Sequence, residues 1–370
     1  MTARPSFTLG IEEEFQVIDP VTRGLKSHIQ EIFDAGIERL KHEIKREMHQ
    51  PVIEVGTPVC ESIQDARREV VRLRKEIITL GRENGVKIGA AGTHPFTHWS
   101  DVPITPNPRY QQMVHDFQVV ARANLVFGLH VHVAVEDNEA RIQLMNAVRY
   151  FLPHVLAMSV NSPFWCGRDT GWHSYRAKVF DRLPRTGIPD YFGSWGEFED
   201  FVRTLVMTGC IDNGKRIWWD VRPHPFFPTL EYRICDVPMR VEETICLAAL
   251  FQAITVKLWK LYSGNMGWRL YRRSLINENK TRAARWGLDG RLIDFGKKAE
   301  VPIEDLLQEL LLFVDDVLDE LGSRREAHYL NDIIRHRPGA SRQLQVYEKT
   351  GSLPAVVDYI VEETACGIEL

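Results

Sequence analysis

The chain contains 370 residues, of which 44% are hydrophobic and 26% are charged. This composition is typical of a folded globular protein and excludes a disordered or fibrous chain. The formal net charge is −4. Such a weakly acidic balance gives no general attraction to a polyanion, so we expect no nucleic-acid partner. At this length, one elaborate domain and two smaller domains are both compatible with a normal hydrophobic core.

The cysteines and the apolar segments indicate a reduced, cytoplasmic setting. The six cysteines are widely spread, and none of them forms a CxxC pair or a spacing typical of a zinc site. The N-terminal residues contain charges and no apolar stretch of the signal-peptide type. The most apolar helical run, residues 245–256, contains Gln252 and is shorter than the roughly 20 residues of a membrane span. We therefore expect a buried helix there and no membrane association.

The first third of the chain predicts strands that alternate with helices. In chain order we expect a strand over 7–18, a helix over 29–40, a strand over 44–55 that is interrupted at Pro51, a charged helix that begins at Ser62 or Asp65 and ends near Gly85, and a short strand over 88–91. In an extended chain Glu12 and Glu14 point to one face, while Glu13 points to the other.

The rest of the chain predicts a few more strands and then mainly helices. We expect a helix from Asn107 to about 124, a strand over 126–135, a helix over 139–160, a long irregular region over 161–195, a helix over 197–207, two strands within 216–236, and amphipathic helices over 241–262, 303–321 and 340–350. The sequence shows no internal repeat and no flexible linker. We therefore predict one α+β domain over residues 1–370, with a sheet-forming part over about 7–240 and a mainly helical part over about 241–370.

The acidic pair Glu12 and Glu14 is a candidate metal site. Hard cations such as Mg²⁺ prefer oxygen ligands, and two carboxylates that share a strand face can bind one ion or bridge two. A solvated acidic strand explains the same pattern, because like charges are common on edge strands. The pair alone does not decide between these interpretations.

Two further pairs of residues share strand faces. His130 and His132 form an HxH pair that resembles the metal-binding arrangement of hydrolases as well as ligases, although hydrogen-bonded core histidines have the same spacing. Glu231 and Arg233 are compatible with a metal ligand beside a phosphate clamp, or with a simple ion pair.

Arginines at two places suit an anionic substrate. Arg176 lies in the long irregular region, and Arg222 follows a tryptophan pair. The guanidinium fork matches carboxylate and phosphate oxygens, but a surface arginine is the ordinary explanation. The sequence contains no P-loop, GxGxxG or GxSxG motif, which excludes the commonest nucleotide-binding and serine-hydrolase signatures.

Several motifs occur together in order: GIEEEF at 10–15, VIEVGTP at 52–58, GTHPF at 92–96, GLHVHV at 128–133, NSPFW at 161–165, WWDVRP at 218–223 and LEYR at 230–233. This series closely resembles the YbdK-type carboxylate–amine ligases, which belong to the glutamate–cysteine ligase type 2 family. The resemblance covers about residues 7–240. It implies a cupped, mainly antiparallel sheet flanked by helices, as in glutamine synthetase, with ATP and magnesium on the concave face.

The resemblance also implies roles for individual residues. The implied metal ligands are Glu12, Glu14, Glu47, Glu54, His130 and Glu231; His130 and Arg233 would contact the nucleotide, and Arg233, Arg222 and Arg176 would act in catalysis. Glu47 lies seven residues before Glu54, and an odd spacing places two residues of one strand on opposite faces. We therefore expect a bulge at Pro51 that restores the facing.

The implied activity is ATP-dependent formation of an amide through an acyl phosphate, with Mg²⁺ or a substituting Mn²⁺. Glutamate and cysteine are the default small-molecule substrates, with weak or genuine glutamate–cysteine ligase activity, and the apolar C-terminal helices are compatible with a homodimer. A metal-dependent amidase or hydrolase is one alternative, and a non-catalytic ATP-binding regulatory protein is another. A requirement for ATP separates the ligase from the hydrolase.

Overall fold

The centre of the protein is an antiparallel sheet built around one long strand, β1 (Leu9–Ile18). The structure is a computed structural model that describes residues 3–27 and 29–369. The strand order is β10-β11-β5-β1-β3-β2, and β4 pairs with the end of β1. The other strands are β2 (Ile44–Arg46), β3 (Val52–Gly56), β4 (Lys87–Gly89), β5 (Gly128–Ala134), β10 (Val221–Pro223) and β11 (Thr229–Asp236). The predicted α+β class with a mainly antiparallel sheet is confirmed.

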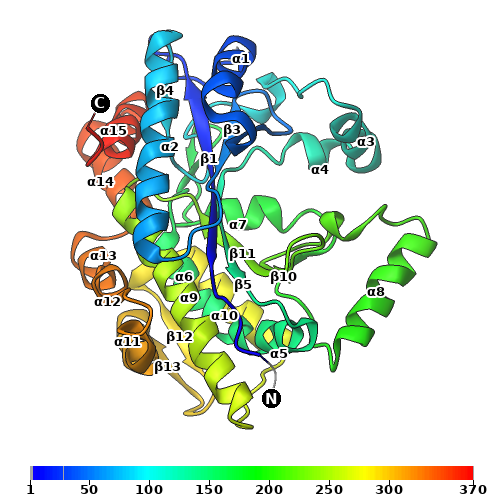
Figure 1. Cartoon of the computed structure of the whole chain (residues 1–370). Coiled ribbons are helices and arrows are strands. Elements are labelled where there is room, and N and C mark those ends of the chain that lie inside the picture. Colours follow the sequence, from blue (N-terminus) through cyan, green and yellow to red (C-terminus); the bar gives the residue numbers. More distant parts are fainter. Residues whose placement is uncertain (1–2, 28, 370) are drawn as a thin grey trace.

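Helices cover one face of this sheet. The long helices α2 (Ile63–Glu83) and α9 (Val241–Ser263) both contact β1, and α6 (Leu152–Ser159) contacts β11. Figure 1 shows α2 and α9 on one side of β1, while α3 (Pro108–Phe117) and α8 (Trp195–Met207) extend on the other side. The sheet therefore has a helix-covered core face and an opposite face that is free to carry polar groups.

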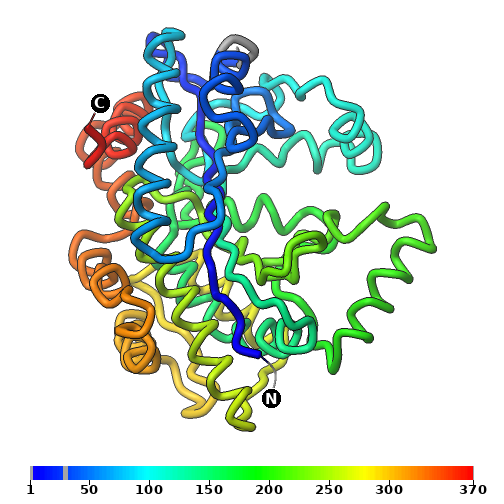
Figure 2. The backbone as a smooth tube through the Cα atoms, in the orientation of Figure 1, coloured from blue at the N-terminus to red at the C-terminus, as the bar shows by residue number. Residues whose placement is uncertain are grey.

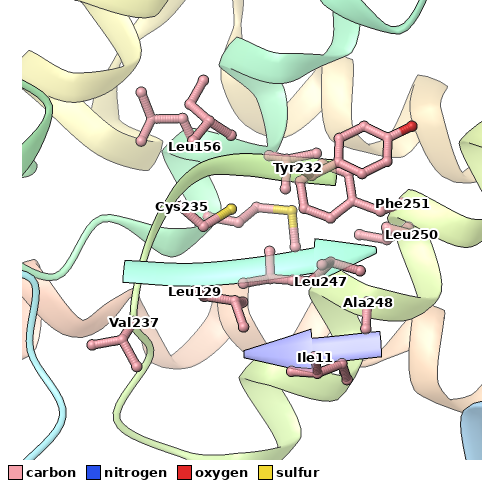
Figure 3. Packing of buried hydrophobic residues seen from close by; sticks show 14 of the residues in the cluster. Ile11, Leu129, Leu156, Tyr232, Cys235, Val237, Leu247, Ala248, Leu250 and Phe251 are labelled. Carbon is pink, nitrogen blue, oxygen red and sulfur yellow. The ribbon is translucent and has the colours of Figure 1, made fainter. Parts of the chain in front are cut away.

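The core lies between the sheet and α9. Ile11 of β1, Leu129 of β5 and Tyr232 of β11 pack near Leu247 and Phe251 of α9 (Figure 3). The rings of Tyr232 and Phe251 stack with centroids 4.1 Å apart. Burying aromatic and aliphatic side chains in this way contributes roughly 1.5–3 kcal/mol for each of them, so this layer fixes the positions of the central strands.

A buried ion pair marks the core face of β1. Glu13 points away from Glu12 and Glu14 and accepts hydrogen bonds from Arg74 Nε (2.9 Å) and Thr244 Oγ1 (2.7 Å). Arg74 is fully buried in α2 and also donates to the carbonyl of Pro238. The three consecutive glutamates therefore divide by strand alternation, as predicted, into one structural acid and two acids on the opposite face.

The remaining elements form small sheets and peripheral helices. They are α1 (Ile29–Leu40), α4 (Val119–Arg122), α5 (Asn138–Val148), β6 (Phe164–Trp165), β7 (Arg168–Asp169), α7 (Tyr175–Phe180), β8 (Thr186–Gly187), β9 (Trp218–Trp219), α10 (Arg273–Trp286), β12 (Arg291–Asp294), β13 (Ala299–Pro302), α11 (Ile303–Leu318), α12 (Arg324–His328), α13 (Leu330–His336), α14 (Gly339–Thr350) and α15 (Leu353–Ala365), with short 3₁₀ turns between some of them. The last helix, α15, packs on α2 and β4, so a helix from the end of the sequence lies beside elements from its first quarter (Figure 2).

The prediction of one interrupted strand over 44–55 is wrong. Residues 44–46 and 52–56 form an antiparallel hairpin, β2–β3, and Glu47 lies in the connection between the two strands. Because the chain reverses, the odd spacing between Glu47 and Glu54 no longer decides their facing, and no bulge at Pro51 is needed. Pro51 occurs before β3, where its missing amide hydrogen costs no hydrogen bond in the sheet.

Two long predicted helices are broken. The segment 107–124 divides into α3 and α4 at Gln118, whose φ of 47° lies in the left-handed region that ends a helix. The segment 139–160 divides into α5 and α6 around a 3₁₀ turn, and Pro153 occupies the first turn of α6. Proline has no amide hydrogen, so it is tolerated there but not within a continuous helix.

One helix of the described chain, α9, is long and apolar enough to cross a membrane by length and composition. However, 78% of its most apolar window is buried inside the protein. A helix that is apolar on all sides fits the centre of a large core. The prediction of a buried helix over 245–256 is therefore confirmed.

Candidate active site

The register of the central strands brings polar side chains to the face of the sheet opposite α9. Directly opposed residues in an antiparallel pair point to the same face. Glu12 lies opposite His130 of β5, and Glu14 lies opposite Glu54 of β3. Three neighbouring strands therefore converge on one polar centre, although their residues are far apart in the sequence.

Glu14, Glu47 and Glu54 form one half of this centre, which we call the three-glutamate cluster. One carboxylate oxygen of each residue lies within 4.8 Å of the other two. Glu14 accepts a 2.6 Å hydrogen bond from the amide of Gly128, and Glu47 accepts a 3.2 Å hydrogen bond from the amide of Met48. The cluster offers only oxygen ligands, which suits a hard cation such as Mg²⁺.

Burial and mutual repulsion oppose ionisation in the three-glutamate cluster. Burial raises the pKa of Glu14 to about 7, and the charge of Glu54 acts in the same direction. Burial and the charge of Glu14 raise the pKa of Glu47 to about 7. Burial, followed by the charges of Glu12 and Glu47, raises the pKa of Glu54 to about 8. The cluster therefore holds protons near neutral pH, and a bound cation would favour its ionised form.

Glu12, His130 and Glu231 form the other half, which we call the histidine cluster. Their candidate ligand atoms also lie within 4.8 Å of one another. β11 places Glu231 opposite His132, so Glu231 shares the face of β5 that carries His130. Burial and the charge of Arg233 lower the pKa of His130 to about 4. Its imidazole is therefore neutral at physiological pH and has a lone pair available for a metal.

Two arginines fix Glu231. Arg222 donates from Nε to Glu231 Oε2 at 2.7 Å and from Nη2 to Oε1 at 3.2 Å, and Arg233 donates from Nη1 to Oε1 at 2.5 Å. Burial alone would raise the pKa of Glu231, but Arg222 and Arg233 hold it well below its ordinary value. Glu231 is therefore ionised and rigidly oriented before any ligand binds.

His132 lies beside the histidine cluster but outside its set of ligand atoms. Its Nδ1 is 3.0 Å from Thr229 Oγ1, and its Nε2 is 3.7 Å from Glu12 Oε2. Within the described chain Nε2 has no hydrogen-bond partner. The ring also contacts His224, with centroids 5.4 Å apart. The two histidines of the HxH pair therefore differ in their surroundings: His130 belongs to the histidine cluster and His132 does not. Their spacing in the sequence could not show this difference.

Arg176 lies in the first turn of α7, and its side chain extends across Gly128. Its Nη1 and Nη2 donate to the carbonyls of Ile234 and Arg233, each at 3.3 Å. A Cβ atom on Gly128 would lie 2.3 Å from Arg176 Nη2, so a side chain at position 128 would displace the Arg176 guanidinium group. The Nε atom of Arg176 is buried without a hydrogen-bond partner among the described residues.

Two buried aspartates, Asp220 of the WWDVRP motif and Asp236, lie outside both clusters and have structural partners. Asp236 is fully buried and accepts hydrogen bonds from Ser162 Oγ (2.6 Å) and Ser174 Oγ (2.8 Å). Asp220 lies 2.9 Å from Lys280 Nζ, and Lys280 is itself buried in α10. The NSPFW and WWDVRP motifs therefore anchor the walls of the site as well as supplying Arg222.

The two clusters open into a cavity of about 440 Å³. Arg109 and Tyr110 of α3 line it beside the three-glutamate cluster, and Phe226 and Phe227 of the β10–β11 turn line it beside the histidine cluster. In Figure 1, α3 and the β10 region lie on the same side of β1. Apolar side chains complete the wall: Met48, Val52, Met113, Val126, Phe180, Leu183 and Trp218.

The sequence alone did not identify three cations at the cavity: Lys45, Arg109 and Lys215. Lys45 would have been recognisable if the turn before β3 had been read as a hairpin, because it then lies opposite Glu54. Arg109 and Lys215 have no local pattern that separates them from surface residues. All of the predicted residues Glu12, Glu14, Glu47, Glu54, His130, Glu231, Arg233, Arg222 and Arg176 line the cavity.

The fold is similar to that of two solved ligases. The structure resembles a glutamate–cysteine ligase from Francisella tularensis that was solved in complex with AMP, with a TM-score of 0.71, 12% sequence identity, and coverage of 98% of this chain and 90% of that one. It also resembles a bifunctional glutathione synthetase from Pasteurella multocida, with a TM-score of 0.71, 14% identity, and coverage of 96% of this chain and 52% of that one. The chain thus has the α+β fold of these ligases.

The family follows from sequence comparison. Residues 8–359 match the model of glutamate–cysteine ligase family 2. A protein from Solibacter usitatus is 57% identical over 368 residues, covering 99% of this chain and 96% of the relative; one from Herpetosiphon aurantiacus is 52% identical over 364 residues, covering 98% and 94%. Both relatives carry the provisional name glutamate–cysteine ligase 2. The chain belongs to glutamate–cysteine ligase family 2.

Proposed function

We propose that the protein is an ATP- and Mg²⁺-dependent ligase that joins a carboxylate to an amine through an acyl phosphate. The observation that carries this proposal is the pair of ligand clusters, which lie side by side on one sheet face and open into one cavity with Arg233. Membership of the family and the AMP complex of the Francisella tularensis ligase support the choice of an adenine nucleotide.

The residues present suit two divalent ions. Glu14, Glu47 and Glu54 would hold one ion, and Glu12, His130 and Glu231 would hold the other. The raised pKa values of the three-glutamate cluster support this assignment, because buried facing carboxylates are costly unless a cation neutralises them. When bound, such ions would neutralise the phosphates of the nucleotide.

Arginine donors in the cavity suit a transferring phosphoryl group. The Nε atoms of Arg233 and Arg176 are buried donors without a hydrogen-bond partner among the described residues. Arg233 would stabilise negative charge on the phosphoryl group as it moves from ATP to the substrate carboxylate. Arg222 is already engaged by Glu231 and by the carbonyls of Lys215 and Ile217. We assign Arg222 a positioning role through Glu231.

The proposed chemistry has two balanced steps. An oxygen of the substrate carboxylate attacks the γ-phosphorus, a new O–P bond forms, and the bond to the β-phosphate breaks to release ADP. The amine then attacks the acyl carbon, phosphate leaves, and the nitrogen loses a proton to give the amide. Glutamate and cysteine are the default pair because of the names of the relatives.

The amidase alternative is less compatible with the site. The catalytic zinc sites of hydrolases are dominated by histidine ligands, with a carboxylate in some of them, and keep an open position for water. Here His132 is outside the ligand sets, and one cluster consists only of glutamates. A non-catalytic regulatory protein would have no physical need for facing buried carboxylates, since their repulsion must be relieved by a proton or a cation.

The test is ADP release and isotope transfer. The purified protein is incubated with ATP, Mg²⁺ and a panel of acids and amines, beginning with glutamate and cysteine, and products are detected by mass. With an oxygen-18-labelled acid, we expect label in the released phosphate, because the carboxylate oxygen bridges to phosphorus in the acyl phosphate. Release of AMP and pyrophosphate, or amide hydrolysis without nucleotide, would contradict the proposal.

A further inference from the structure

Lys45 connects the two clusters. It lies on β2 opposite Glu54, so its side chain points to the polar face of the sheet. Its Nζ atom is 2.8 Å from Glu12 Oε1 and 2.7 Å from Glu54 Oε1. One ammonium group therefore binds one carboxylate from the histidine cluster and one from the three-glutamate cluster.

The other cations near the centre are engaged elsewhere. Arg222 and Arg233 bind Glu231, and Arg176 binds two backbone carbonyls. Among the lysines and arginines that the structure describes, Lys45 is the one that forms ion pairs with both Glu12 and Glu54. It therefore neutralises part of the charge that a divalent ion would neutralise.

The contacts of Glu12 leave little room for a further cation. Its Oε1 accepts the hydrogen bond from Lys45, and its Oε2 lies 3.3 Å from His130 Nδ1. A carboxylate can bind a metal through one oxygen while the other accepts a hydrogen bond, but the ammonium charge of Lys45 then lies close to the metal and repels it. Movement of Lys45 away from Glu12 and Glu54 therefore favours filling of both clusters.

The position of Lys45 permits this movement. β2 is the last strand of the sheet, and the Lys45 side chain is 48% exposed, whereas that of Glu54 is 7% exposed. A long flexible lysine at a sheet edge can rotate into solvent at low cost. The buried carboxylates, by contrast, are held in place by their strands.

We propose that Lys45 is an internal cation that competes with divalent metals for Glu12 and Glu54. It stabilises the metal-free site, and its release is part of metal binding, so Lys45 sets the metal concentration at which the site fills. This inference rests on the proposed function, because it treats the two clusters as metal sites. It assigns to Lys45 a role that differs from that of a ligand or a catalytic residue.

The test is Mn²⁺ binding without nucleotide, measured by titration calorimetry and by the electron paramagnetic resonance signal of free Mn²⁺. For Lys45→Met we expect Mn²⁺ to bind about tenfold more tightly or better than to the wild type, because a charge about 3 Å from the ligand oxygens no longer opposes it. The melting temperature of the metal-free variant should fall, while that of the Mn²⁺-loaded variant should change little. A merely structural role would weaken metal binding, so the sign of the change is decisive.

Three further variants control the experiment. Lys45→Arg keeps the charge, and its Mn²⁺ affinity should stay near that of the wild type. Lys45→Gln removes the charge but keeps a hydrogen-bond donor, and it replaces the methionine variant if that protein does not fold. Lys297 bridges Asp294 (3.3 Å) and Glu309 (2.9 Å) at the surface, so Lys297→Met makes the same change in net charge and should leave Mn²⁺ affinity unchanged.

The outcomes test the role of Lys45 and the existence of the metal sites separately. Unchanged or weaker Mn²⁺ binding in both neutral Lys45 variants overturns the role of Lys45 and leaves the metal sites intact. Absence of Mn²⁺ binding in the wild type and in all variants overturns the metal sites and the inference together. Binding by the neutral variants but not by the wild type supports competition in its strongest form.

Discussion

The histidine cluster and the three-glutamate cluster share one sheet face but differ in how their charge is balanced. In the histidine cluster Arg222 and Arg233 hold Glu231 ionised, and His130 is neutral. The three-glutamate cluster contains no such arginine pair, and burial raises the pKa values of its members to about 7, 7 and 8. The charges of the histidine cluster are therefore balanced before ligands bind. The charges of the three-glutamate cluster must be neutralised by a proton, by Lys45 or by a metal.

The largest effect is expected from a substitution that breaks the histidine cluster. Glu231→Gln leaves Arg222 and Arg233 buried without their anionic partner, and removing one partner of a buried pair costs about 3–5 kcal/mol. We expect a loss of unfolding free energy of this size in urea denaturation, together with loss of substrate-dependent ADP release.

Glu300→Gln is the matched control, because Glu300 pairs with Arg282 at the surface, where its side chain is 54% exposed. Such exposed pairs contribute little to stability. Equal stability losses in the two variants, or near-normal turnover of Glu231→Gln, would contradict the assigned role of Glu231.

A change in the three-glutamate cluster should have the opposite sign. Glu54→Gln removes a carboxylate whose ionisation is opposed by burial and by Glu12 and Glu47. At pH 8 and without metal we expect the variant to be more stable by about 1 kcal/mol or more. The pKa of Glu54 is raised to about 8 and each pKa unit corresponds to about 1.4 kcal/mol, while the loss of the Lys45 contact offsets part of the gain. Its catalytic activity should nevertheless be lost.

The control for this variant is Glu43→Gln, which removes a more exposed glutamate that pairs with Arg72. It should change stability by less than about 1 kcal/mol in either direction. Clear destabilisation of Glu54→Gln in urea unfolding would show that the three-glutamate cluster is not under electrostatic strain.

The pH dependence of stability should separate the two clusters further. A carboxyl group with a raised folded pKa stabilises the fold below its unfolded pKa, and this contribution is lost as the pH rises through the folded value. For Glu14, Glu47 and Glu54 the loss extends to about pH 7–8. From pH 6.5 to 8.5 the metal-free protein should therefore lose up to about 1.4 kcal/mol per pH unit for each proton involved.

His132 adds to the loss in this window: burial alone would lower its pKa, but Glu12 and Glu231 raise it, so the stability that it contributes is also lost as the pH rises. The buried histidines with lowered pKa values do not obscure the window. His49, His94 and His130 have pKa values lowered by burial to about 4, so the stability they contribute is lost only as the pH falls below the unfolded value. Saturating Mg²⁺ should flatten the slope between pH 6.5 and 8.5, and Glu54→Gln should reduce it. A flat profile in the metal-free wild type, measured by thermal unfolding, would disagree with the raised pKa values.

The smallest expected effect is proton release on metal binding. At pH 7 the three-glutamate cluster must lose on the order of one proton when a cation binds, because metal ligands are deprotonated. Calorimetry in buffers of different ionisation enthalpy measures this number directly. Glu54→Gln should release fewer protons than the wild type, and equal release by the two proteins would place the titrating group elsewhere.

Much of the fold could be predicted from local sequence. The strand containing Glu12 and Glu14, the helix capped by Ser62 and the buried helix α9 follow from periodicity and capping, which are properties of neighbouring residues. The breaks at Gln118 and before Pro153 were missed. There the hydrophobic pattern continues across the break, and the breaks are visible only in the backbone, as the positive φ of Gln118 and the 3₁₀ turn before α6.

The sequence by itself determined which acids share a strand face, because alternation along β1 and β5 is a local property. Only the tertiary structure decided how these strands combine. The β2–β3 hairpin places Glu47 beside Glu14 and Lys45 between Glu12 and Glu54, and the register of β11 on β5 assigns Glu231 to the cluster of His130 and not to that of Glu54. The physical reason is that strand register depends on long-range core packing, and the charge balance of each glutamate depends in turn on that register.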